Sequence, residues 1–162
     1  MLPLYKNILV PTDLSPNSDY AFKHAVMISR QSNAKIHLLH VIPEINPSLR
    51  IYLYPVSRDS SQTELEQKNI KEAQIEIKKN LNNFVKKELE NFPEDLARFA
   101  GVEVCVGHPS VEILEAATKL NADLIIIGTH GKGALEHAFL GSVAEKVLHK
   151  TTRPVFVVPL PK

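Results

Sequence analysis

The sequence predicts a doubly wound α/β fold, with a five-stranded parallel sheet of order 3-2-1-4-5 and helices on both faces. Five short apolar runs alternate with segments of helical spacing, in the order βαβαβαβαβ. The runs are almost continuously apolar, which indicates strands that are covered on both faces. Polar residues and glycine follow the first and fourth runs. We therefore expect the winding to reverse between these two strands and a ligand crevice to lie there.

Each element has a local reason in the chain. The strands are expected at the apolar runs of residues 7–11, 35–42, 102–106, 124–127 and 155–158. Helices are expected where apolar residues recur every three or four positions: residues 16–32, 63–90, 109–120 and 142–150. Ser15 before Pro16 is a typical start for the first helix. Phe92-Pro93 is expected to end the long helix.

Composition indicates one globular domain, residues 1–162. The chain is 44% hydrophobic and 23% charged, with a net charge of +1, so neither nucleic acid nor a membrane surface is expected as a partner. No stretch approaches the ~18 apolar residues of a membrane span. Cys105 is the one cysteine, which fits a reducing compartment, and its apolar strand predicts an inert thiol. A cytoplasmic protein is the expectation.

Two segments carry no motif. Residues 43–61 contain three prolines and a Ser-rich end, and are expected to form a long loop, mobile or partly helical. The long helix that follows carries six Lys and six Glu on its remaining faces. This mixture indicates a solvated face and not a binding patch.

A glycine cluster carries the strongest functional signal. Gly128 and Gly131 follow the fourth strand, and Gly141-Ser142 opens the last helix after nine intervening residues. Free N–H groups at a helix start bind anions, and glycine leaves room for a phosphate. The alternative is ordinary turn and cap chemistry. Three of six glycines at one strand–helix junction favour a phosphate-bearing ligand between Gly128 and Ser142.

Other motifs are absent from the sequence. It contains no G-x-x-x-x-G-K-[ST], no G-x-G-x-x-G after the first strand and no G-x-S-x-G. His37 and His40 lie at odd spacing on one strand and are expected to pack or cap. The remaining histidines lack metal-ligand spacing, apart from His130, which lies inside the glycine cluster. His130 is either a solvated loop residue or a neighbour of the phosphates.

Taken together, the motifs resemble the universal stress proteins. The G-x2-G-x9-G-S spacing from Gly128 to Ser142 matches their nucleotide motif, as do residues 7–13, His40-Val41 and residues 153–155. The resemblance covers the whole chain and its five-strand order. It is closest to the ATP-binding branch, because members that do not bind ATP lack this glycine spacing. It implies a Rossmann-like sheet of the adenine nucleotide alpha-hydrolase-like type.

The resemblance also implies a site. Asp13 and Val41 would face the adenine, while Pro11, Thr12, Ile127 and Gly128 would line the adenosine. The remaining five residues would hold the phosphates: His130, Gly131, Gly141, Ser142 and Val143. Ala144 departs from relatives with Thr or Ser at this place, so the number of phosphate contacts is open.

The expected function is an ATP-dependent sensor or switch in a stress response, not an enzyme. AMP or ADP are alternative ligands, and Mg²⁺ would enter through the phosphates. The rival interpretations are a slow Mg²⁺-dependent ATPase and an interaction module whose nucleotide is only structural. No carboxylate is assigned to the phosphate end, because Asp13 is expected at the adenine end and the direction of Glu136 is open. Lys132 could contact the phosphates, but a solvated loop charge is favoured over a catalytic one. A homodimer through the edge strand at residues 155–158 is also expected.

Overall fold

Five parallel strands form one sheet of order β3-β2-β1-β4-β5, which confirms the predicted topology. The computed structural model describes residues 1–44, 60–130 and 140–161. The strands are β1 (Asn7–Thr12), β2 (Lys35–Pro43), β3 (Phe99–Gly107), β4 (Leu124–Gly128) and β5 (Val155–Val158). β1 is central and pairs with β2 on one side and β4 on the other. The winding therefore reverses between β1 and β4.

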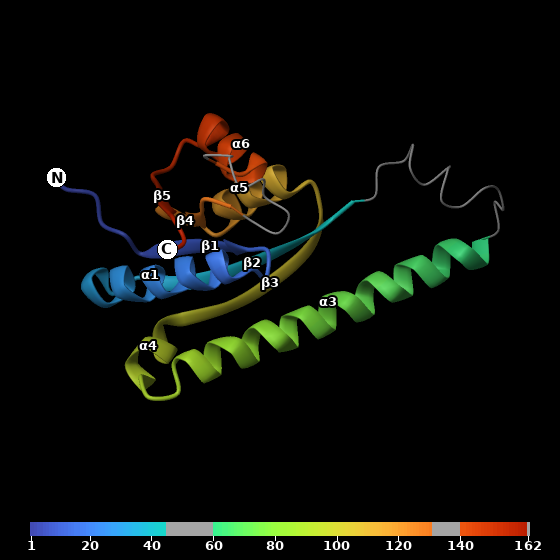
Figure 1. Ribbon diagram of the computed structural model, residues 1–162, viewed down its shortest axis with the longest axis horizontal. Coiled ribbons are helices and arrows are strands. Elements are labelled where there is room, and N and C mark those ends of the chain that lie inside the picture. The colour runs from blue at the N-terminus through green and yellow to red at the C-terminus, as the bar shows by residue number, and fades with distance from the viewer. Residues whose placement is uncertain (45–59, 131–139, 162) are drawn as a thin grey trace.

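Helices cover both faces of this sheet. The described helices are α1 (Pro16–Ser32), α3 (Ser60–Glu88), α4 (Pro93–Arg98), α5 (Pro109–Lys119) and α6 (Ser142–Lys150). Figure 1 shows α1 and α3 on one face, and α5 and α6 on the other. α1 begins as predicted, because the Ser15 hydroxyl accepts a hydrogen bond from the Ser18 N–H at 3.3 Å. It ends at Asn33, whose φ of 57° is the left-handed conformation typical of a helix end.

Two elements depart from the prediction, and both depart around residue 100. β3 is longer than the predicted 102–106 because it continues through the small residues Ala100 and Gly101, which do not read as an apolar run. Gly101 has a φ of 139°, and the pairing of β2 with β3 shifts register beside it. α4 was not predicted. Its Pro93 is a good first helical residue, but six residues are too few to show helical spacing.

The two faces have separate cores, which the alternation of β2 explains. Leu38 points to the side of α1 and α3, where it packs with Phe22 and Val85. Leu39 points to the opposite side. There the core includes Ile113 of α5 and Val147 of α6. All six side chains are at most 2% exposed, and burying each contributes about 1.5–3 kcal/mol.

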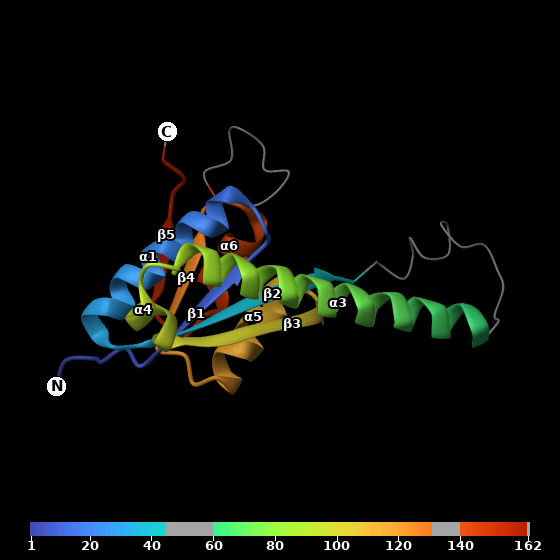
Figure 2. The ribbon, with the colours of Figure 1, turned by 90° about the horizontal axis from the view of Figure 1, so that it is seen from below.

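α3 is held only along its second half. Leu81 and Val85 are buried, as is Leu89 directly after the helix, and the Gln74 side chain donates a hydrogen bond to the Val104 carbonyl at 3.0 Å. Toward its start, α3 runs beyond the sheet (Figure 2), and Leu65 there is 59% exposed. In the described parts of the chain, no helix combines the length and apolarity that a membrane span needs.

Candidate functional site at the ends of β1 and β4

The sequence predicts a ligand crevice at the ends of β1 and β4, and these two strands are neighbours that end at the same edge of the sheet. Ile8 of β1 pairs with Leu124 of β4, and Leu9 pairs with Ile125. Continuing this register places Pro11 level with Ile127, and both side chains are buried. On the other side of β1, Thr12 pairs with His40, which places Asp13 level with Val41. The sheet thus brings the predicted adenosine residues to one edge.

The loop after β1 is fixed by short polar side chains. The Thr12 hydroxyl lies 2.9 Å from the Ser18 hydroxyl and accepts a hydrogen bond from the Leu14 N–H at 3.1 Å. Asp13 Oδ1 accepts from the Ser15 N–H at 3.0 Å, which closes an Asx turn. Leu14 has a φ of 67°, a conformation that costs energy for a branched residue and that these bonds hold. The turn presents Asp13 next to the start of α1.

The His40 imidazole of β2 contacts the backbone where this loop begins. Its Nδ1 lies 2.8 Å from the Thr12 carbonyl oxygen. Because a carbonyl can only accept, Nδ1 carries the proton in this contact. The sequence predicted a packed or capping histidine here, and the structure confirms it. The contact fixes the backbone of β1 immediately before Asp13.

The loop after β4 is bonded to three elements. The Thr129 N–H donates to the Val158 carbonyl of β5 at 3.1 Å, and the Thr129 carbonyl accepts from the Gly141 N–H at 2.6 Å. The His130 N–H donates to Asn17 Oδ1 of α1 at 2.8 Å. His130 Nδ1 lies 3.0 Å from the Thr129 hydroxyl. Gly131, the next residue of the predicted site, lies outside the described residues, as do Lys132 and Glu136.

α6 begins at the site, as the glycine motif predicts. Gly141 is its N-cap, and among the described residues no side chain caps the helix there. Its φ of −68° and ψ of 154° are available to any residue, so the backbone conformation there does not require glycine. The amides of Ser142, Val143 and Ala144 have no acceptor within the helix, by α-helix geometry. Ser142 is exposed, so its hydroxyl can reach a ligand at this helix start.

The cysteine and the acidic groups do not form a reactive centre among the described residues. Burial, with the nearby Glu112 carboxylate, raises the pKa of Cys105 to about 11, which keeps the thiol protonated and inert as predicted. In residues 1–44, 60–130 and 140–161, no group of three His, Cys, Asp or Glu side chains is arranged to hold a metal ion.

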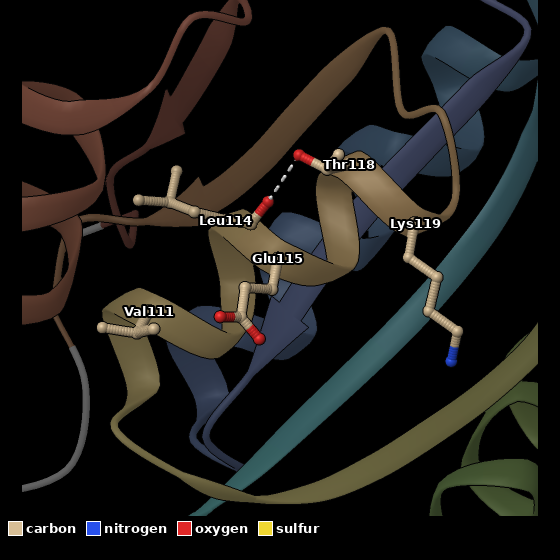
Figure 3. A pocket seen from close by; sticks show the side chains of 5 residues that line it. All are labelled: Val111, Leu114, Glu115, Thr118 and Lys119. Carbon is tan, nitrogen blue, oxygen red and sulfur yellow. Dashed lines mark hydrogen bonds between the residues drawn. The ribbon is translucent and has the colours of Figure 1, made fainter.

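A hollow of about 510 Å³ lies elsewhere, on the outer face of α5. Figure 3 shows that its lining comes from one helix, with Val111 and Leu114 on one side and Lys119 on the other. The Thr118 hydroxyl there is already bonded to the Leu114 carbonyl at 3.2 Å. This hollow shares no residue with the strand ends, so we do not assign the ligand to it.

Sequence reasoning missed Asn17. This residue is 5% exposed, and its amide contacts the loops at the ends of both β4 and β5. A signal was present, because Asn17 lies four residues before Ala21 and eight before Ala25 on the buried stripe of α1. A polar residue at the head of an apolar stripe needs hydrogen-bond partners when it is buried.

Sequence and structure place the chain in a family. The model of the universal stress protein family matches residues 4–159, so the chain belongs to the universal stress proteins. Two relatives from Methanocaldococcus jannaschii are universal stress protein MJ0577, 35% identical over 98% of this chain and 97% of its own, and MJ0531. MJ0531 is 36% identical over 98% of this chain and 85% of its own.

Solved structures of universal stress proteins have the same fold as this chain. The structure of MJ0577 matches with a TM-score of 0.76 and 34% identity, over 99% of both chains. A universal stress protein from Archaeoglobus fulgidus, solved in complex with dAMP, matches with a TM-score of 0.56 and 20% identity. That match covers 96% of this chain and 99% of the other and supports the fold alone.

Proposed function

We propose that this protein binds ATP at the edge formed by the ends of β1 and β4. The adenine lies by Asp13 and Val41, and the adenosine lies along Pro11, Thr12, Ile127 and Gly128. The phosphates lie at His130, Gly131, Gly141, Ser142 and Val143. The observation that carries the proposal is the start of α6, which the Gly141–Thr129 hydrogen bond holds against the loop that leaves β4.

The chemistry of this edge supports a nucleotide. The N-terminus of α6 offers backbone donors and the positive end of a helix dipole, both of which favour a phosphate. Val41 near the end of β2 and Ile127 near the end of β4 offer apolar groups at this edge of the sheet, and the Asp13 turn adds polar groups. The complex of the Archaeoglobus fulgidus relative with dAMP is consistent with an adenine nucleotide on this fold. AMP and ADP remain as alternative ligands.

Calorimetry with ATP, ADP, AMP and GTP tests this proposal. We expect adenine nucleotides to bind and GTP to bind more weakly. The matched variant is Gly141→Val, because the φ of Gly141 accepts any side chain while a branched one would occupy the place of the phosphates. It should stay folded and lose binding. The proposal fails if no adenine nucleotide binds at millimolar concentration, or if Gly141→Val binds ATP as the parent does.

The bound nucleotide acts in a sensor or switch, and the protein is not an efficient enzyme. Phosphoryl transfer requires neutralised charge and an oriented water, and the proposed phosphate contacts are backbone amides, Ser142 and His130. Mg²⁺ would enter with the phosphates. We expect turnover of radiolabelled ATP with Mg²⁺ to stay far below the ~1–1000 per second that is typical of enzymes. Turnover above about one per second, lost in Glu136→Gln, would favour the ATPase.

The proposal also includes a homodimer that forms through β5. We place the protein in the cytoplasm. β5 is an edge strand, and Phe156 on it is 43% exposed, with its ring centroid 6.1 Å from that of His24. An apolar edge without Lys or Glu favours association. Light scattering should give a dimer that Val157→Lys disrupts. A monomer at high micromolar concentration, or a dimer that tolerates Val157→Lys, would contradict it.

A further inference from the structure

Asn17 joins three separate parts of the molecule through one side-chain amide. It lies in the first turn of α1 and is 5% exposed. Its Nδ2 donates to the Val158 carbonyl at the end of β5, at 3.1 Å. Its Oδ1 accepts from the His130 N–H in the loop after β4, at 2.8 Å. The amide therefore bonds α1 to the end of β5 through Nδ2 and to the loop that leaves β4 through Oδ1.

The absence of a side chain at Gly128 leaves the space that the Asn17 amide occupies. A Cβ at position 128 would lie 2.6 Å from Asn17 Oδ1 and 2.7 Å from its Cγ, closer than side-chain atoms approach one another. Any other residue at 128 would therefore have to displace Asn17. The first glycine of the motif thus has a role inside the protein, besides leaving room for a ligand.

The bonds of Asn17 continue toward the start of α6. The Val158 carbonyl that accepts from Asn17 also accepts from the Thr129 N–H at 3.1 Å. The Thr129 carbonyl in turn accepts from the Gly141 N–H at 2.6 Å. Asn17 therefore fixes residues 128–130 relative to the helix start that supplies phosphate donors.

We propose that Asn17 is a positioning residue for nucleotide binding, which holds residues 128–130 in the binding conformation before the nucleotide arrives. The proposal rests on the nucleotide function proposed above and adds a residue that touches the loop rather than the ligand. Without Asn17, the loop would occupy the binding conformation only part of the time. The apparent affinity then falls by that fraction.

Ser29→Ala provides a matched control for Asn17→Ala. Ser29 is also a buried polar residue of α1, but it lies in the last turn, where its hydroxyl donates to the Ala34 carbonyl at 2.6 Å. Both variants should lower the urea midpoint. Only Asn17→Ala should weaken ATP binding, by about 3- to 10-fold, the effect of losing one buried hydrogen bond. Equal ATP affinity in Asn17→Ala and Ser29→Ala would overturn the proposal.

Amide exchange in the ligand-free protein separates this inference from the nucleotide function. Asn17→Ala should speed exchange at the His130 amide, while Ser29→Ala should leave it unchanged. This result would support the positioning role even if the parent failed to bind ATP, which would refute only the nucleotide function. Unchanged exchange at His130 in Asn17→Ala would overturn the positioning role even if ATP binds.

Gly128→Ala completes a double-mutant cycle with Asn17→Ala. The added methyl should displace the amide, so Gly128→Ala alone should speed His130 exchange as Asn17→Ala does. In the Asn17→Ala background the clash with the amide is gone, and the methyl should add little to the exchange rate. If the two substitutions changed the His130 exchange rate additively, Asn17 would not depend on the space at Gly128, and this part of the proposal would be overturned.

Discussion

The two ends of helix α1 are attached to the rest of the protein by different kinds of side-chain interaction. At each end, polar side chains bond the helix to other parts of the chain. The buried polar groups of the first turn are neutral: Asn17 bonds to Val158 and His130, and Ser18 contacts Thr12. The last turn uses charge, because Arg30 donates from Nε to both carboxylate oxygens of Asp95 at 2.9 Å.

The charged end is a closed ion cluster. Asp95 is 4% exposed and also accepts a hydrogen bond from Arg98, whose Nε donates to the Ser29 hydroxyl at 3.0 Å. The Arg30 guanidinium also lies 4.9 Å from the centroid of the Phe92 ring. This cluster joins α1 to α4, at the opposite end of α1 from the proposed site. The two guanidiniums and the carboxylate are paired with one another, so we expect the cluster to stabilise the fold.

The neutral end is suited to a charged ligand. A nucleotide brings several negative charges, and fixed carboxylates at the phosphate end would repel them. Asn17, Thr129 and the α6 backbone can position the loop without adding charge. The comparison therefore assigns stability to the last turn of α1 and ligand binding to the first, and each assignment can be tested separately.

The largest expected effect is on stability, from Asp95→Ala. Removing the carboxylate leaves Arg98 with the Ser29 hydroxyl and Arg30 with the Phe92 ring. We expect a loss of about 1.5–3 kcal/mol in the free energy of unfolding, measured with urea, because the hydrogen bonds of a buried carboxylate to charged groups are lost. ATP affinity at a temperature where the variant is folded should match the parent. A weakened affinity would contradict the separation of the two ends.

Acid should weaken the charged end in the parent protein. The hydrogen bond from Arg30 lowers the pKa of Asp95 below its usual value. A carboxylate with a lowered pKa in the folded state stabilises the fold above its unfolded pKa of about 4, and this contribution is lost as the pH falls further. Urea unfolding from pH 6 to pH 3 should show this loss. Asp95→Asn should have a shallower dependence below about pH 4; an identical slope would refute the assignment.

At the neutral end, Ser15→Ala tests the cap of α1. Its hydroxyl accepts from the Ser18 N–H, so its removal should cost about 1 kcal/mol of stability, as for other N-caps. This is a smaller loss than we expect for Asp95→Ala, which reflects the neutral chemistry of the first turn. The urea midpoints of the two variants give the comparison directly. A larger loss for Ser15→Ala would reverse the order of the two ends.

The same two ends show what sequence can and cannot predict. Ser15-Pro16 marks the start of α1 by local chemistry, and the apolar runs mark all five strands, so the sheet order followed. The family motif indicated Gly128, Gly141 and Ser142 because their spacing is local to one strand–helix junction. Interactions between residues that are close in the chain can be predicted from a single sequence.

Contacts between distant residues were not predictable in this way. Asn17 and Val158 are 141 positions apart, and Arg30 and Asp95 are 65 apart. Nothing in the pattern around Asn17 indicates which backbone groups it will meet, although its place on a buried stripe shows that it must meet some. α4 was missed for a related reason. Its six residues are tied to α1 through the Asp95 cluster rather than defined by their own periodicity.

The smallest expected effect comes from Ser142→Ala, and it should appear only with nucleotide present. Ser142 is exposed and does not cap α6, so its loss should change the free energy of unfolding by less than about 0.5 kcal/mol in the absence of ligand. If its hydroxyl binds a phosphate, ATP affinity should fall by about 0.5–1.5 kcal/mol, or 2- to 12-fold. Calorimetry and urea unfolding on the same preparation measure both. Asn17→Ala differs in kind, because it should lower stability as well as affinity. A Ser142→Ala variant with unchanged ATP affinity would move the phosphates away from this hydroxyl and leave the backbone amides of α6 as their donors.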